Sequence, residues 1–129
     1  MKKIGFTVLS VIFLLASLVY AADQGKIAVA AEGKTAAAKV SGVAARAPYF
    51  LIFDESGKLL EAVDNPYKAA KGGAGTSVVP FLAQKGATVV VAGEFGENMI
   101  QAMKSKGIGY LEFKGSTEEA LKKALEAKK

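Results

Sequence analysis

Three glycines, Gly72, Gly73 and Gly75, stand just before a run of apolar residues with helical spacing. Glycines at the start of a helix leave backbone N–H groups accessible, and the first helical turn carries a partial positive charge. Such a segment can therefore bind an anion. The spacing matches neither G-x-G-x-x-G nor G-x-x-x-x-G-K-[ST], so neither standard nucleotide-binding motif is present. The alternative interpretation is a plain loop, because glycine clusters are common in turns.

The flanking sequence predicts the elements that position this cluster. Apolar and aromatic runs predict five strands, at Lys26–Ala31, Tyr49–Asp54, Leu59–Val63, Thr88–Ala92 and Ile108–Phe113. Helical spacing predicts helices over Thr76–Gln84 and Asn98–Lys106, and a third that begins at Ser116 or Thr117. This order predicts an α/β domain with three layers, α/β/α, and a mixed five-stranded sheet in which the second strand is antiparallel.

Two details of the predicted helices bear on where they begin. Pro80 is tolerated if its helix starts near Ser77, because the first helical turn does not use its N–H groups. Asn98 is expected to cap the second helix.

The predicted topology brings several segments to one edge of the sheet, where ligands bind in open α/β folds. Two helix N-termini open onto this edge, and arginine and lysine side chains can add full positive charges. We expect a lid at Phe95. The candidate anion-binding residues are Lys34, Arg46, Gly72, Gly73, Gly75, Thr76, Gly93, Phe95, Gly96 and Asn98.

Composition excludes much of enzyme chemistry. The 129-residue chain contains no cysteine and no histidine, which removes thiolate and imidazole ligands, nucleophiles and bases. We therefore expect a protein that is not an enzyme. Met99 and Met103 lie four residues apart, and the thioether of Met99 is a candidate soft metal ligand. The alternative, which we favour, is that both methionines fill the core.

The first 21 residues differ from the rest. Lys2 and Lys3 precede an apolar run, and Val19 and Ala21 supply small residues at the end, as in a secretory signal peptide. Cleavage would leave residues 22–129 as an exported domain, periplasmic or secreted; the alternative is an uncleaved anchor. Removal of the two lysines leaves 15 basic and 12 acidic side chains, too weak a charge for a nucleic-acid binder.

Several segments together resemble the dinitrogenase iron–molybdenum cofactor biosynthesis family. They are KIAVA with a following EGK, RAPYFLIFD, NP with GGAG, VVVAGEFGENMIQAMKSKGI, and GSTEEAL. The resemblance implies a ribonuclease-H-like fold with strand order 3-2-1-4-5. It also implies binding or carriage of anionic metal–sulfur clusters or their precursors. The matching positions are Arg46, Gly72, Gly73, Gly75, Gly93, Gly96 and Asn98.

These observations predict a non-enzymatic binding or carrier protein. Its expected ligand is an anionic molybdenum- or iron-containing sulfide cluster, or a metal oxyanion or thioanion. Without thiolates or imidazoles, the ligand would be held by charge and hydrogen bonds. We expect a monomer or weak dimer. The alternative is an exported interaction module with no bound cofactor, which docks a redox partner.

Overall fold

The computed structural model describes residues 25–127, so the predicted signal peptide lies outside the described part of the chain. A mixed five-stranded sheet has the order β3-β2-β1-β4-β5, as expected. The strands are β1 (Lys26–Ala31), β2 (Tyr49–Phe53), β3 (Leu59–Asp64), β4 (Ala87–Ala92) and β5 (Gly109–Glu112). β1 pairs in parallel with β4, and β4 with β5, whereas β2 is antiparallel to both of its neighbours.

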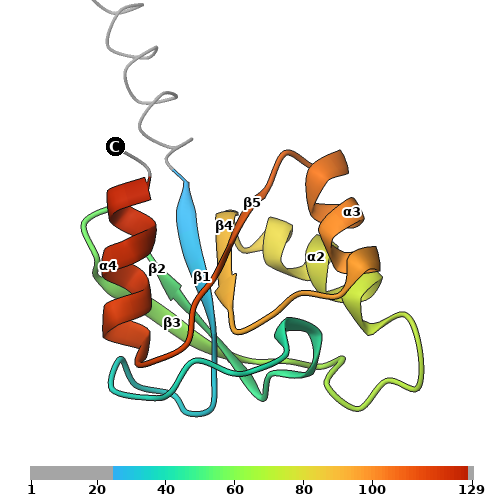
Figure 1. Ribbon diagram of the computed structural model, residues 1–129, viewed down its shortest axis with the longest axis horizontal. Helices are drawn as coiled ribbons and strands as arrows, with labels where there is room; N and C mark the ends of the chain where they lie inside the picture. Colours follow the sequence, from blue (N-terminus) through green and yellow to red (C-terminus); the bar gives the residue numbers. More distant parts are fainter. Residues whose placement is uncertain (1–24, 128–129) are drawn as a thin grey trace, which may run out of the picture.

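Helices cover both faces of the sheet (Figure 1). α4 (Thr117–Ala127) packs on one face, while α2 (Ala74–Gln84) and α3 (Glu97–Ser105) pack on the other. Successive residues of a strand point to opposite faces, so β1 serves two cores. Ala28 and Ala30 join the core under α2 and α3, whereas Ile27 and Val29 join the core under α4. The predicted three-layer architecture is confirmed.

α2 begins earlier than the apolar spacing predicts. Its N-cap is Gly73, whose φ of 70° places it in the left-handed region, and the helix starts at Ala74. Pro80 therefore lies inside the helix rather than in its first turn, contrary to our expectation. Its ring is tolerated on the exposed side of α2, where the lost hydrogen bond leaves a carbonyl that water can reach.

α3 also begins differently from the prediction. Its N-cap is Gly96, in extended conformation, and no side chain caps the helix. Asn98 is the second residue of the helix rather than its cap. The helix therefore has its N-cap two residues earlier than an Asn98 cap would place it.

α4 has a reciprocal cap formed by Ser116 and Glu119. The Ser116 backbone N–H and hydroxyl donate to Glu119 Oε1 over 3.2 and 3.0 Å, and the Glu119 N–H donates to Ser116 Oγ over 3.2 Å. This is the capping-box arrangement. These bonds favour the ionised carboxylate, first the one from the Ser116 backbone N–H, and they lower the pKa of Glu119 below its ordinary value.

The cap should make stability depend on pH. Because the pKa of Glu119 is lower in the folded protein than in the unfolded chain, its contribution is complete above the ordinary glutamate pKa. That contribution is lost as pH falls through the lower, folded value. We expect the stability gap between the native protein and Glu119→Gln to close over this range, as measured by thermal unfolding at successive pH values. Glu118→Gln, which removes a charge in the same turn without touching Ser116, is the control; a gap independent of pH would contradict the assignment.

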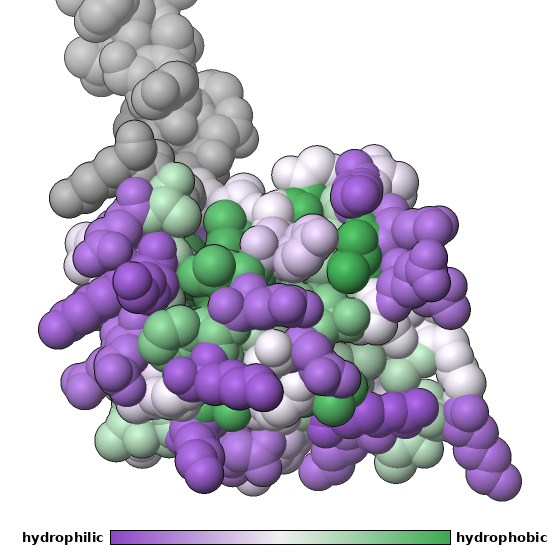
Figure 2. All heavy atoms as spheres, viewed as in Figure 1, coloured by the Kyte–Doolittle hydropathy of each residue, from purple (hydrophilic) through white to green (hydrophobic). Residues whose placement is uncertain are grey.

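The face of the molecule around β5 is only partly covered. Figure 2 shows hydrophobic residues gathered between α4 and α3, framed by polar side chains on both helices. Val89, Leu111 and Phe113 are partly buried against the α4 core on this side. Among residues 25–127, no helix combines the length and the apolar character needed to cross a membrane.

Candidate anion-binding site

A pocket of about 350 Å³ lies where the first turns of α2 and α3 meet the 3₁₀ helix η1 (Ala44–Arg46). Its size is within the range of small-ligand sites. Seven of the predicted candidates line it, namely Arg46, Gly73, Gly75, Thr76, Gly96, Asn98 and Met99. The tertiary structure therefore brings residues from three separate segments of the sequence to one place.

The pocket is rich in backbone N–H groups. Neither α2 nor α3 has a side-chain cap. The first N–H of α2 bonded within the helix is that of Ser77, which donates to Gly73 O over 3.0 Å. In α3 the equivalent bond runs from the Ile100 N–H to Gly96 O, also over 3.0 Å. The N–H groups of the preceding three residues in each helix are left for a ligand or water.

Gly75 allows the two helices to meet. A Cβ atom at this position would lie 3.0 Å from Met99 Cβ and 3.3 Å from Met99 N, closer than ordinary contact. Any side chain here would push the start of α2 away from the start of α3. Because both N-termini carry partial positive charge, their close approach concentrates that charge on one pocket.

A hydrogen-bonded clamp holds the chain that leads into the glycine cluster. Arg46 Nη1 donates to the carbonyl oxygens of Lys68, over 3.0 Å, and of Ala70. A guanidinium has five N–H donors, so others remain beyond those of Nη1, and Arg46 lines the pocket. Arg46 thus has a structural partner as well as a position at the candidate site.

Asn65 forms the other half of the clamp, and sequence reasoning missed it. Its side chain is almost fully buried, at 2% exposure. Nδ2 donates to the carbonyl oxygens of Ala45 and Ala47, both over 2.9 Å, and Oδ1 accepts from the Tyr67 N–H over 2.9 Å. In the sequence, Asn65 precedes a proline at the end of a strand and is indistinguishable from a turn residue. Only the contact with Ala45 and Ala47 reveals its role.

Four predicted site residues are not placed around the pocket in the expected way. Gly72 is exposed and adjacent to the pocket without lining it. The Lys34 ammonium lies over the Tyr49 ring, 5.3 Å from its centroid. Gly93 lines a different pocket, and a Cβ there would lie 2.8 Å from Gly42 Cα and O, so close packing explains this glycine.

Phe95 is the fourth, and the expectation of a lid is wrong. Its side chain is 8% exposed and belongs to the core under α2 and α3. The ring packs on Tyr110, with 5.2 Å between centroids. Its apolar surface is better buried between α3 and β5 than exposed above a polar pocket.

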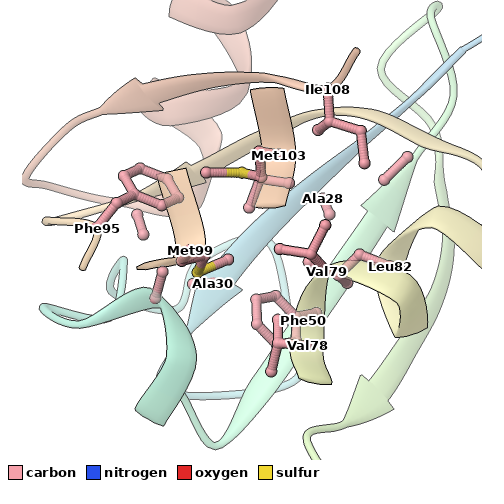
Figure 3. Close-up of a cluster of buried hydrophobic side chains, with 14 of the residues drawn as sticks. Ala28, Ala30, Phe50, Val78, Val79, Leu82, Phe95, Met99, Met103 and Ile108 are labelled. Atoms are coloured by element: carbon pink, nitrogen blue, oxygen red, sulfur yellow. The ribbon is translucent and has the colours of Figure 1, made fainter. Parts of the chain in front are cut away.

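The two methionines fill the core, as favoured above. Met99 is 1% exposed and Met103 is fully buried, and Figure 3 shows both among the apolar side chains between the helices and the sheet. No group of three or more acidic side chains in the described residues is placed to hold a metal ion, and the chain has no histidine or cysteine. The donor set therefore fits an anion bound by N–H groups rather than a metal ion ligated directly.

The pocket also contains one acidic side chain. Glu97, the first residue of α3, lines it and is exposed. A carboxylate in the first turn stabilises the helix, but it opposes an anionic ligand in the same pocket. This residue offers a direct electrostatic test of the site.

Fold and pocket together define an α/β protein of ribonuclease-H-like topology with a pocket at the edge of its sheet that is lined by two helix N-termini and Arg46. The chain belongs to the dinitrogenase iron-molybdenum cofactor family, whose model matches residues 25–127. No curated protein gives a significant match.

Solved structures agree with this assignment. The apo form of the orange protein from Desulfovibrio gigas is 30% identical, with a TM-score of 0.74 over 81% of this chain and 89% of that one. A putative NifB protein from Thermotoga is 34% identical, with a TM-score of 0.65 over 80% and 88%. A putative dinitrogenase from Methanococcus jannaschii, 15% identical with a TM-score of 0.53 over 81% and 90%, supports the fold alone.

Proposed function

We propose that the protein is a non-enzymatic carrier for an anionic metal–sulfur cluster or a metal oxyanion or thioanion, bound as cargo in the pocket between α2 and α3. The observation that carries the proposal is the meeting of two helix N-termini without side-chain caps beside Arg46. The family supports a metal-containing ligand. The apolar N-terminal segment in the sequence supports an exported carrier.

The available donors fit such a cargo. Sulfido and oxo ligands of a complex anion accept hydrogen bonds, and the pocket offers backbone N–H groups and a guanidinium. Charge-assisted hydrogen bonds contribute roughly 1.5–3 kcal/mol each. Three or four of them, reduced by the cost of ordering the complex, give an affinity on the order of micromolar. A carrier requires binding that is specific and also reversible.

The proposal assigns no catalytic residue. Glu97 is the one ionisable acid among the lining residues of the pocket, and no second carboxylate, histidine or cysteine lines it with Glu97. General acid–base or nucleophilic chemistry needs such a partner within hydrogen-bonding reach. Binding and release are therefore the functions that this pocket supports best.

Removing the charge of Glu97 should strengthen binding of a thioanion. We expect Glu97→Gln to bind tetrathiomolybdate about fivefold more tightly, since one surface charge acting at short range changes the binding free energy by roughly 1 kcal/mol. Arg46→Ala should weaken binding about tenfold or more, because it removes a full positive charge and loosens the loop before Gly72. Equilibrium dialysis with molybdenum analysis measures both effects.

Glu118→Gln is the matched control for this experiment. Glu118 lies in the first turn of α4, on the other face of the sheet, and is exposed like Glu97. The substitution changes the net charge equally, so its affinity should equal that of the native protein. Equal effects of Glu97→Gln and Glu118→Gln on the affinity, or no binding of tetrathiomolybdate at all, would reject this pocket as the site. The better hypothesis would then be an interaction module without a bound cofactor.

A further inference from the structure

A second pocket, of about 520 Å³, lies at the carboxyl ends of the parallel strands β1, β4 and β5. Each strand contributes the residues that follow it: Glu32 after β1, Gly93 after β4, and Lys114 with Gly115 after β5. The strand order reverses between β1 and β4, and such a reversal is where open α/β sheets bind ligands. This pocket shares no lining residue with the one between α2 and α3.

The walls of the second pocket are held by backbone hydrogen bonds. The segment that includes Lys39 and Gly42 is tied on both sides of the pocket. The Val40 N–H donates to Gly115 O over 2.9 Å, and the Gly93 N–H donates to Ser41 O over 2.8 Å. A site fixed in this way loses little entropy when a ligand binds.

The same segment separates the two pockets. Gly42 lines the second pocket, whereas Val43 lines the first. Val43 forms a parallel bridge with Glu94, and the Ala44 N–H donates to Glu94 O over 3.0 Å. A ligand in the second pocket is therefore in a space distinct from the proposed cargo site.

The two lysines that line the second pocket have no ionic partner among the described residues. Lys39 and Lys114 approach it from two different loops, and neither forms an ion pair or a side-chain hydrogen bond with another residue between 25 and 127. Glu32 supplies one carboxylate to the same lining. The lining thus includes two lysines and one glutamate around a space large enough for a small organic molecule.

We propose that this second pocket binds a small dianion, either a dicarboxylate or a phosphate. Lys39 and Lys114 would each form an ion pair with anionic oxygens of the ligand. Gly42 lets the ligand approach the backbone, because it lines the pocket and the space where a Cβ would stand is open. Glu32 limits the affinity, because its carboxylate repels the ligand. The site is separate from the proposed cargo pocket and does not depend on it.

The experiment is a titration of the isotope-labelled full-length protein with inorganic phosphate and separately with succinate, followed through backbone amide signals. Gly42, Gly93 and Gly115 report the second pocket, whereas Gly73, Gly75 and Gly96 report the first. We expect saturable shifts in the first set with at least one of the two anions, and the stronger response identifies the kind of ligand. Glu32→Gln should raise the affinity about threefold.

Two variants test the assignment of the pocket. Lys39→Gln combined with Lys114→Gln should lower the affinity about tenfold or more, whereas Lys122→Gln with Lys123→Gln, the same charge change on the exposed side of α4, should not. Gly42→Leu should abolish the shifts with no loss of thermal stability. A Cβ at Gly42 meets no atom within 4 Å, and this glycine is not among those with positive φ.

Three results would overturn the proposal. The first is a set of shifts confined to Gly73, Gly75 and Gly96, and the second is an absence of saturable shifts with both anions. The third is equal affinity for the anion in the two double-lysine variants. The first of these results would leave the proposed carrier function intact, because it would place the anion in the pocket between α2 and α3. Loss of thiomolybdate binding without loss of the dianion site would reject the carrier function alone.

Discussion

Asn65→Asp is expected to destabilise the protein by about 3 kcal/mol or more, because two buried carbonyl groups lose their donors. Aspartate has nearly the same shape as asparagine, but it cannot donate to the oxygens of Ala45 and Ala47, 2.9 Å away. At 2% exposure the new carboxylate is also taken out of water without a cationic partner in the contacts of Asn65. Urea unfolding followed by circular dichroism measures the change.

Asn98→Asp is the matched control for this substitution. Asn98 is exposed in the first turn of α3, where a negative charge is tolerated by the helix dipole. We expect its stability to stay within about 0.5 kcal/mol of the native protein. Similar midpoints for the two variants would mean that the bonds of Asn65 do not hold η1 to the loop before the glycine cluster.

Gly75→Val is expected to lower affinity for tetrathiomolybdate about tenfold or more while the fold is retained. Even the first atom of the new side chain would meet Met99 Cβ at 3.0 Å, so the starts of α2 and α3 must separate. After such a separation, an anion bound to the N–H groups at the start of one helix could no longer reach those at the start of the other. Strain of this kind costs roughly 1–3 kcal/mol of stability, which thermal unfolding would detect.

Gly72→Val separates the geometric effect from a general effect of glycine loss. A Cβ at Gly72 meets nothing within 4 Å, and its φ is not in the positive region. Affinity and stability should therefore remain close to those of the native protein. If Gly75→Val bound the thioanion as tightly as Gly72→Val, the approach of the two helices would have no part in binding.

The order and type of the elements followed from local patterns in the sequence. The apolar run of β4 and the aromatic run of β2 predicted buried strands, and the sheet order followed from the family resemblance. The absence of histidine and cysteine, a property of composition alone, also restricts the chemistry of any site. Periodicity and composition are properties of neighbouring residues, so they can be read without the fold.

The starts of the helices were less well predicted. Gly73 is the N-cap of α2 and has a positive φ, whereas Gly96 is the N-cap of α3 and is extended. Neither glycine has the polar side chain by which an N-cap is recognised in a sequence. The prediction therefore placed the first start near Ser77, to bring Pro80 into the first turn, and the second at Asn98, because asparagine is a common cap. Because glycine can adopt many backbone conformations, its presence alone does not indicate where a helix begins.

Which of the candidate residues meet was decided by tertiary packing. Gly75 lies against Met99, and Asn65 against Ala45 and Ala47, although 24, 20 and 18 positions separate these pairs in the sequence. Gly93 and Phe95 fit the pattern of site residues equally well, but the approach of Gly42 and the burial against Tyr110 account for them. The sequence by itself determined the fold and the kind of donor available. The division of one sheet edge into two separate pockets depends on contacts between distant backbone segments, and only the tertiary structure contains that information.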